Sequence, residues 1–213
     1  MGNKSKRIGL LGGTFDPIHN GHLGLAEQAI QLFDLQRVLF IPASRSPHKL
    51  HFQPSSSAHR VAMLQLALEG KTTFSLELLE IARNGISYTL ETISQLINQH
   101  PDWELFLILG ADAFVEMATW KSYADIFKLC HVLVSTRPGV KLEVPEKLYQ
   151  TLALTKTLLE NNNKPQQIVL DPAVGKTLQF FQIPPQDISS KEIRRRVQAG
   201  KEIKNLLPPA VDH

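Results

Sequence analysis

Short apolar runs alternate along the chain with stretches whose apolar residues recur at helical spacing. Residues 8–11 form the first run, and residues 23–33 follow it with the periodicity of an amphipathic helix. Residues 37–41 form a second run that Pro42 ends, and residues 59–69 again have the helical period. Parallel strands joined by helices produce this alternation, so we expect an α/β fold, a doubly wound Rossmann-like parallel sheet with helices on both faces.

The same alternation continues toward the C-terminus. It predicts strands or extended segments at residues 74–81, 104–109, 131–135, 168–170 and 178–183, and helices at residues 90–97 and 145–160. In open α/β sheets, ligands bind at the carboxyl ends of the strands. The polar and glycine-containing segments that follow the predicted strands are therefore the candidates for a binding site.

The bulk composition narrows the class of protein. The chain has 213 residues, of which 43% are hydrophobic and 20% charged, so we expect a single globular domain over residues 1–213. Its net charge of +3 suits an anionic small substrate and is too small to indicate nucleic acid. Cys130 is the only cysteine, which excludes a disulfide framework and suits the reducing cytoplasm. No apolar run is long enough to span a membrane.

Residues 12–22, with the sequence Gly-Gly-Thr-Phe-Asp-Pro-Ile-His-Asn-Gly-His, form the loop between the first predicted strand and the first predicted helix. Two adjacent glycines allow the backbone to approach a ligand closely. Asn20 is a suitable N-cap, which places His22 in the first helical turn, where free N–H groups and the helix dipole attract phosphate. His19 adds a further donor. A zinc site is not indicated, because no cysteine cluster or His-Glu-x-x-His element accompanies the two histidines.

Residues 188–194, with the sequence Ile-Ser-Ser-Lys-Glu-Ile-Arg, form a second candidate phosphate site. Ser189 and Glu192 have the spacing of a capping box at a helix start. A capped helix start offers backbone amides to a phosphate, and Arg194 can add a forked contact to the phosphate oxygens. The basic run that ends at Arg196 otherwise suits a solvated helix face.

The first motif resembles the signature of the nucleotidylyltransferase superfamily, and the chain more narrowly resembles bacterial nicotinate-nucleotide adenylyltransferases. The second motif resembles that family's Ile-Ser-Ser-Thr-x-Ile-Arg, with Lys191 in place of threonine. The likeness extends to Ser46-Pro47-His48-Lys49, in which Ser46 replaces a proline, and to Ser87-Tyr88-Thr89, Gly110-Ala111-Asp112, Thr119-Trp120 and Arg137-Pro138-Gly139. It covers most of the chain, with residues 141–176 as the main gap.

The resemblance implies a role for each of these segments. For catalysis it implies His22, His19, Lys49 and Arg194. For ATP binding it implies Gly12, Gly13, Thr14, Phe15, His19, His22, Gly110, Asp112, Arg137, Ile188, Ser189, Ser190 and Arg194, and the C-terminal helical part from about residue 185 would complete this site. For the nicotinate nucleotide it implies Thr14, Lys49, Ser87, Tyr88, Thr89 and Trp120. Each position also has an ordinary structural alternative, namely a loop lysine, a helix cap, a core tryptophan or a turn arginine.

Two further residues have less definite roles. Arg60, near the start of the predicted helix at residues 59–69, matches a recurrent family position and equally suits the exposed face of that helix. We expect Asp16 to brace the loop of the first motif or to reach a metal ion through water.

The implied reaction is transfer of the adenylyl group of ATP to nicotinate mononucleotide, which yields nicotinate adenine dinucleotide and pyrophosphate for NAD biosynthesis. Mg²⁺ would enter with ATP. The acceptor phosphate is itself the nucleophile, so positioning and charge stabilisation are expected to carry catalysis. Nicotinamide mononucleotide, and more distantly phosphopantetheine or glycerol 3-phosphate, remain alternative acceptors. A non-catalytic nucleotide-binding or RNA-binding module is the alternative from another class, and a homo-oligomer stays open.

Overall fold

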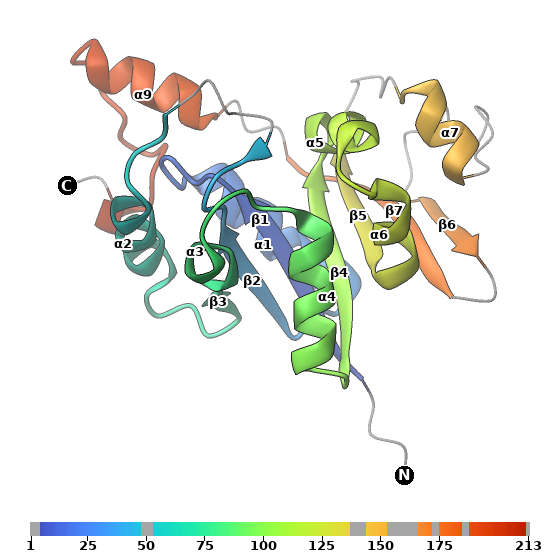
Figure 1. Cartoon of the computed structure of the whole chain (residues 1–213). Coiled ribbons are helices and arrows are strands. Elements are labelled where there is room, and N and C mark those ends of the chain that lie inside the picture. Colours follow the sequence, from blue (N-terminus) through green and yellow to red (C-terminus); the bar gives the residue numbers. More distant parts are fainter. Residues whose placement is uncertain are drawn as a thin grey trace. The chain divides into compact units, whose positions relative to one another are not determined.

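The computed structural model describes residues 5–47, 53–136, 144–152, 166–171, 175–184 and 188–211. The chain forms two compact units. Unit 1 consists of Met1–Gly9 and Tyr88–Pro185, and unit 2 consists of Leu10–Ser87 and Gln186–His213. Figure 1 shows strand β1 (Lys6–Gly13) as one continuous strand. Its first residues belong to unit 1 and its last residues to unit 2. The expectation of one domain over residues 1–213 stays a prediction.

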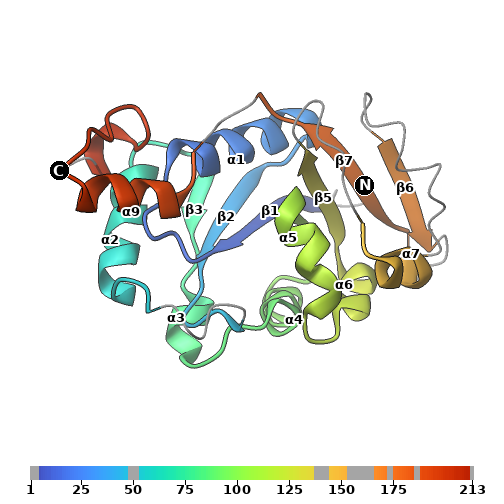
Figure 2. The same ribbon diagram turned by 90° about the horizontal axis from the view of Figure 1, so that it is seen from above.

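Unit 2 contains the end of β1 and the strands β2 (Arg37–Pro42) and β3 (Phe74–Leu76), in the order β3-β2-β1. Strands β2 and β3 run parallel, with Val38 opposite Phe74. The helices are α1 (Asn20–Phe33), α2 (Ser57–Leu68), α3 (Leu79–Arg83), α9 (Ser190–Gln198) and the 3₁₀ helix η3 (Pro209–Val211). Figure 2 shows α1 on one side of β1 and β2 and α3 on the other.

The residues of β2 explain its place in the interior. Val38, Leu39, Phe40 and Ile41 are all buried, as expected for a strand covered on both faces. Helix α1 buries Leu23, Leu25, Ala26 and Ala29, which lie on one stripe of the helix and face this core.

Unit 1 contains the start of β1 and the strands β4 (Trp103–Gly110), β5 (His131–Thr136), β6 (Gln166–Asp171) and β7 (Lys176–Gln182). Their order is β1-β4-β5-β7-β6. Strands β4, β5 and β7 run parallel to one another, whereas β6 is antiparallel to β7. The helices are α4 (Thr89–Gln99), α5 (Ala111–Glu116), the 3₁₀ helix η2 (Met117–Thr119), α6 (Tyr123–Leu129) and α7 (Glu146–Leu152).

Most of the predicted elements are confirmed within one to three residues at their ends. The prediction of an extended segment over residues 74–81 is wrong beyond Leu76, because residues 79–83 form helix α3. The predicted helix at residues 145–160 is confirmed from Glu146 to Leu152, and its remainder lies outside the described residues. Within the described ranges, no helix is both long and apolar enough to cross a membrane.

Candidate functional site

The loop between β1 and α1 folds back on itself through Gly13 and Phe15. Phe15 has a φ of 50° and is buried, with its ring 5.8 Å from Phe40 and edge-on to His22 at 5.0 Å. A Cβ atom at Gly13 would lie 3.1 Å from the Phe15 ring. Glycine at position 13 therefore makes room for the buried ring, which in turn shapes the loop that the sequence predicts to bind phosphate.

Helix α1 begins at Asn20, and its N-cap is His19 rather than the predicted Asn20. The His19 N–H donates to Nδ1 of His22 at 3.2 Å, and the two imidazole rings stack with centroids 3.7 Å apart. Because Nδ1 of His22 is the acceptor, its neutral ring carries its proton on Nε2. Burial lowers the pKa of His19 to about 4, so this ring is neutral at pH 7. The first turn of α1 thus presents one Nε2–H donor and a neutral, stacked neighbour.

Asn20 does not cap α1 as predicted but bonds to the C-terminal segment. Its Nδ2 donates to the carbonyls of Asn205 at 2.9 Å and Leu207 at 3.2 Å, and its N–H donates to the carbonyl of Leu206 at 3.0 Å. The start of α1 is therefore fastened to a segment more than 180 residues later in the chain. A local helix-capping argument could not anticipate these partners, because they lie close to Asn20 only in the folded chain.

The second motif forms helix α9 with Ser189 as its N-cap. Ser189 Oγ accepts the Glu192 N–H at 3.2 Å, which confirms half of the predicted capping box. The other half is wrong, because the Glu192 carboxylate pairs with Arg195 at 2.8 Å and Arg196 at 2.9 Å. The hydrogen bonds from these two arginines lower the pKa of Glu192 to about 2.

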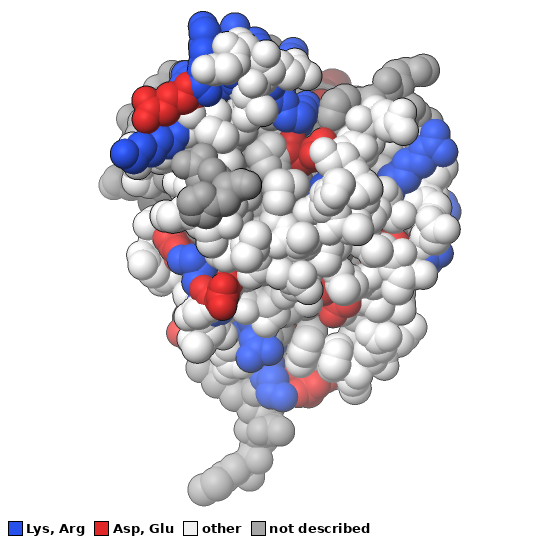
Figure 3. Space-filling view, turned by 90° about the vertical axis from the view of Figure 1, so that its left-hand side faces the viewer, with Lys and Arg blue, Asp and Glu red and all other residues white. Residues whose placement is uncertain are grey.

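Helix α9 is joined directly to the β1–α1 loop. Ser190 Oγ donates to the Pro17 carbonyl at 2.8 Å, and Nη1 of Arg194 donates to the Asp16 carbonyl. These bonds bring the two sequence motifs together, although more than 170 residues separate them. Figure 3 shows Lys and Arg side chains gathered near the top of one face, where α9 lies. This helix carries Lys191, Arg195 and Arg196. The phosphate-binding candidates of unit 2 therefore meet beside a positively charged helix.

Arg60 has a role that the sequence left undecided. It is 1% exposed, and its guanidinium donates to backbone carbonyls of Thr14 at 2.8 Å, Ser55 at 3.1 Å and Ser44 at 3.5 Å. It also donates to Ser57 Oγ at 3.2 Å. Of the two alternatives that the sequence left open, the exposed helix arginine is therefore excluded. A signal was present in the sequence, since Arg60, Leu64, Ala67 and Leu68 fall on one helical stripe and all four are buried.

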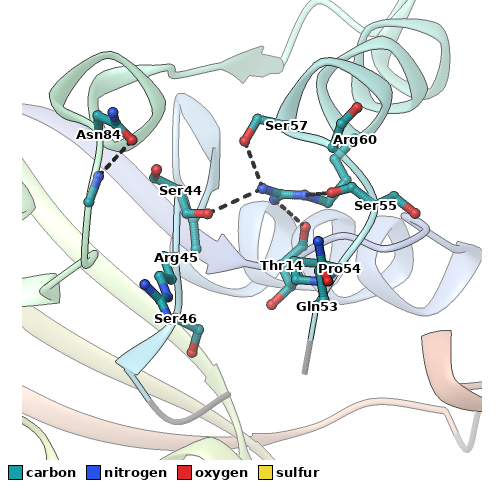
Figure 4. Close-up of a pocket in the computed structure, with 13 residues that line it drawn as sticks. Thr14, Ser44, Arg45, Ser46, Gln53, Pro54, Ser55, Ser57, Arg60 and Asn84 are labelled. Atoms are coloured by element: carbon teal, nitrogen blue, oxygen red, sulfur yellow. Dashed lines mark hydrogen bonds between the residues drawn. The ribbon is translucent and has the colours of Figure 1, made fainter. Parts of the chain in front are cut away.

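A cavity of about 650 Å³ opens beside Arg60 (Figure 4). Hydroxyl, amide and guanidinium groups dominate its lining, which consists of Thr14, Ala43, Ser44, Arg45, Ser46, Gln53, Pro54, Ser55, Ser56, Ser57, Arg60, Asn84 and Gly85. Thr14 is the member of this lining that the resemblance assigns to both nucleotides. A cavity of this size and polarity suits part of a phosphorylated sugar.

Asp16 braces the wall of the same cavity. Its Oδ2 accepts the Ser55 N–H at 3.1 Å, and its carboxylate is buried near the Arg60 guanidinium. The expected bracing role is confirmed by this bond.

Ser87 and Thr89 are not the helix caps that the sequence suggested, because the N-cap of α4 is Tyr88. Ser87 instead makes two hydrogen bonds to the loop that follows β2. Its Oγ accepts the Ser44 N–H at 3.0 Å, and its N–H donates to the Arg45 carbonyl at 2.9 Å. Ser87 belongs to unit 2, and its bonds connect it to the cavity lining.

The remaining predicted residues belong to unit 1 or lie outside the described part, except Ile188, which belongs to unit 2. Lys121 Nζ lies 4.3 Å from the Tyr88 ring centre and 2.9 Å from Glu91, so the residue after Trp120 contacts the start of α4. Gly110 is the N-cap of α5, and Asp112 lies in its first turn. Lys49 and Arg137 lie outside the described residues. Ile188 is half-buried just before the α9 cap.

Comparison with known proteins decides the family. The cytidylyltransferase-like family model matches residues 10–196. A probable nicotinate-nucleotide adenylyltransferase of Geobacter sp. (strain M21) is 40% identical over 206 residues, which cover 97% of this chain and 94% of that protein. The chain belongs to this family. A second family member, from Desulfitobacterium hafniense (strain Y51), is 38% identical over 97% of this chain and 91% of its own length.

Solved structures agree on the fold. The nicotinic acid mononucleotide adenylyltransferase of Plasmodium falciparum, complexed with NaAD, superposes with a TM-score of 0.71 over 97% of this chain and 92% of that one, at 16% identity. A putative nicotinate-nucleotide adenylyltransferase from Vibrio parahaemolyticus gives a TM-score of 0.62 over 97% of this chain and 89% of its own, also at 16% identity. The predicted doubly wound α/β fold of the nucleotidylyltransferases is confirmed, with β6 as its antiparallel edge strand.

Proposed function

We propose that this family member transfers the adenylyl group of ATP to nicotinate mononucleotide and releases nicotinate adenine dinucleotide and pyrophosphate. The observation that carries the proposal is the union of its two phosphate motifs, in which Ser190 and Arg194 of α9 bond to the backbone of Asp16 and Pro17. A non-catalytic binding module that needed only one phosphate site would have no evident use for the second motif, residues 188–194, at the β1–α1 loop.

Adenylyl transfer requires the two substrates to be positioned more than it requires the nucleophile to be activated. The acceptor phosphate attacks the α-phosphorus of ATP in line, a P–O bond forms, and the bond to the pyrophosphate leaving group breaks. The attacking oxygen is already anionic, so no covalent intermediate with the protein is needed. The charge that builds on the α-phosphate is what the protein must stabilise.

His22 is the donor best placed for that charge. Its Nδ1 is occupied by the His19 N–H, which directs its proton to Nε2. We assign Nε2–H to an α-phosphate oxygen, with neutral His19 holding the ring by stacking. Lys49 and Arg194 would neutralise the charge of the phosphates. The bond from Arg194 to the Asp16 carbonyl holds Arg194 beside the β1–α1 loop.

We assign the parts of the two nucleotides to residues of each unit in turn. In unit 2, Gly12, Gly13, Thr14 and Phe15 would form the phosphate loop, with Ile188, Ser189 and Ser190 at the α9 start. In unit 1, Gly110, Asp112 and Arg137 would contact the adenosine part. The pyridine ring would lie near Trp120. Its carboxylate would take the backbone N–H groups of Tyr88 and Thr89, because a helix start leaves several amides unbonded. Ser87, whose own N–H binds the Arg45 carbonyl, would lie beside them.

Mg²⁺ fits this site as a cation that arrives on ATP. The described residues contain no group of three or more Cys, His, Asp or Glu side chains arranged to hold a metal ion. Mg²⁺ in nucleotide sites commonly takes phosphate oxygens, waters and one or two carboxylates, and Asp16 is the buried carboxylate of the phosphate loop. When bound, the ion would neutralise phosphate charge. We place the enzyme in the cytoplasm, which suits its buried, free Cys130.

Pyrophosphate release tests the proposal with purified protein, ATP and Mg²⁺. Nicotinate mononucleotide, nicotinamide mononucleotide and phosphopantetheine are offered in parallel reactions. We expect the acid mononucleotide to give the fastest release. Faster release with another acceptor would overturn the acceptor assignment, and the absence of release with all three would favour a binding module. Salt-dependent RNA binding would then be measured, since a steep dependence is typical of phosphate contacts with nucleic acid.

A further inference from the structure

Arg60 connects three segments that the chain brings to one wall of the cavity. Its Nη1 reaches the Thr14 carbonyl in the phosphate loop, and its Nη2 reaches the Ser44 carbonyl in the loop after β2. Its Nε reaches the Ser55 carbonyl just before α2, and Nη2 also reaches Ser57 Oγ. Figure 4 shows the guanidinium directed into the space between these groups.

The contacts are specific for a guanidinium. Arginine carries five N–H donors in a planar fork, so it can serve carbonyls that lie in different directions. Lysine has three donors at a single point and cannot reach the same set of acceptors. A buried cation also needs electrostatic compensation, which the Asp16 carboxylate supplies while its Oδ2 accepts the Ser55 N–H.

Holding a carbonyl fixes a peptide plane. In a trans peptide the N–H of the next residue points opposite to the carbonyl, so the bond to Thr14 also sets the direction of the Phe15 N–H. The bond to Ser44 fixes a segment whose N–H is bound by Ser87 Oγ and whose next carbonyl binds the Ser87 N–H. Arg60 thereby fixes Thr14 and Ser44 relative to each other.

We propose that Arg60 is a positioning residue, which holds the Thr14 loop and the Ser44–Ser46 segment at the separation that places the two reacting phosphates in line. The proposal rests on the proposed adenylyl transfer. The donors of Arg60 are bound by three loop carbonyls and Ser57 Oγ, so its loss should misplace the phosphates more than it weakens nucleotide binding. A misplacement of about 1 Å can lower a rate about 100-fold.

The test compares Arg60→Lys with Leu64→Ala. Leu64 lies one turn later on the same buried stripe of α2 and has no place in the site, so Leu64→Ala is a matched loss of stability. At a temperature where both variants are folded, we expect Arg60→Lys to lower kcat by about 10- to 100-fold while the KM for ATP changes by less than about threefold. We expect Leu64→Ala to keep kcat within about twofold of wild type. Arg60→Gln, which keeps two N–H donors, is the second variant should Arg60→Lys fail to fold.

Amide hydrogen exchange supplies a readout that does not need turnover. We expect faster exchange at residues 13–16 and 43–46 in Arg60→Lys than in Leu64→Ala. If the Arg60 variants keep the wild-type kcat, or lose it only as Leu64→Ala does, the positioning role is overturned. If the wild-type protein makes no dinucleotide, the proposed function has failed. Unchanged exchange at residues 13–16 and 43–46 in Arg60→Lys would separately overturn the positioning role of Arg60.

Discussion

The backbone N–H of His19 donates to Nδ1 of His22 at 3.2 Å, while the two imidazole rings stack 3.7 Å apart. This pair gives a reason for histidine at both positions of the helix start that we propose to bind phosphate. One ring is buried and neutral and serves as a support, and the other has its tautomer set by a backbone bond. The three-residue spacing therefore brings together a supporting ring, that of His19, and a hydrogen-bond donor, that of His22.

His22→Asn should separate donation from local structure. The asparagine Oδ1 can still accept the His19 N–H, but the variant lacks a donor at the position of Nε2. We expect kcat for pyrophosphate release to fall by about 100- to 1,000-fold, the scale typical of one lost oxyanion donor. His59→Asn, at an exposed histidine of α2, is the control and should keep wild-type kcat. Turnover of His22→Asn within a few-fold of wild type would remove His22 from the mechanism.

The burial of His19 should appear in the pH dependence of stability. Its pKa is about 4 in the folded chain, whereas the ordinary value for a solvated histidine is 6.5, so the unfolded chain binds more protons between these values. The free energy of unfolding should therefore decrease as the pH falls from about 6.5 to about 4, by up to about 3 kcal/mol from this residue. Chemical denaturation at several pH values measures the slope.

His19→Gln isolates this contribution. Burial also lowers the pKa of His131, which acts in the same direction, so only the difference between wild type and variant reports on His19. We expect a shallower slope for the variant. Equal slopes would show that His19 titrates normally in the folded protein.

Gly13→Ala and Gly12→Ala should differ in stability although the two glycines are adjacent. The new Cβ at position 13 would lie 3.1 Å from the buried Phe15 ring, whereas no described atom lies within 4 Å of one at position 12. We expect Gly13→Ala to lower the free energy of unfolding by about 1–3 kcal/mol, the cost of overpacking. Gly12→Ala should leave it unchanged or slightly higher. Urea denaturation gives both values, and equal values would contradict the described packing of Phe15.

Asn20→Ala should loosen the C-terminal segment. The substitution removes two donors and leaves the carbonyls of Asn205 and Leu207 without their side-chain partner. We expect a loss of about 1–3 kcal/mol in unfolding free energy and faster proteolysis after residue 200. Gln31→Ala, on the exposed face of the same helix, is the control and should change little. Wild-type protease resistance in Asn20→Ala would show that other contacts hold this segment.

The sequence predicted the elements whose signals are local. Apolar runs located β2, β4 and β5, and the serine at position 189 located the start of α9. These predictions held because strand burial and helix capping depend on neighbouring residues.

The parts that failed depend on contacts between distant residues or on competing partners. Asn20 bonds to residues 205–207 instead of capping α1, and Glu192 pairs with arginines on its own helix instead of completing the capping box. Arg60 was ambiguous because an arginine on a helix is usually exposed, and only the folded loops supply the carbonyls that compensate its burial. The partners available in the folded chain decided each of these three cases.

The most direct test of adenylyl transfer follows the acceptor oxygens into the products. Nicotinate mononucleotide with an ¹⁸O-labelled phosphate is incubated with the protein, ATP and Mg²⁺, and the products are resolved by mass spectrometry. Attack of the acceptor oxygen on the α-phosphorus predicts that all of the label enters nicotinate adenine dinucleotide and that the pyrophosphate carries none. Release of AMP with a pyrophosphorylated acceptor, or the absence of any dinucleotide, would contradict adenylyl transfer.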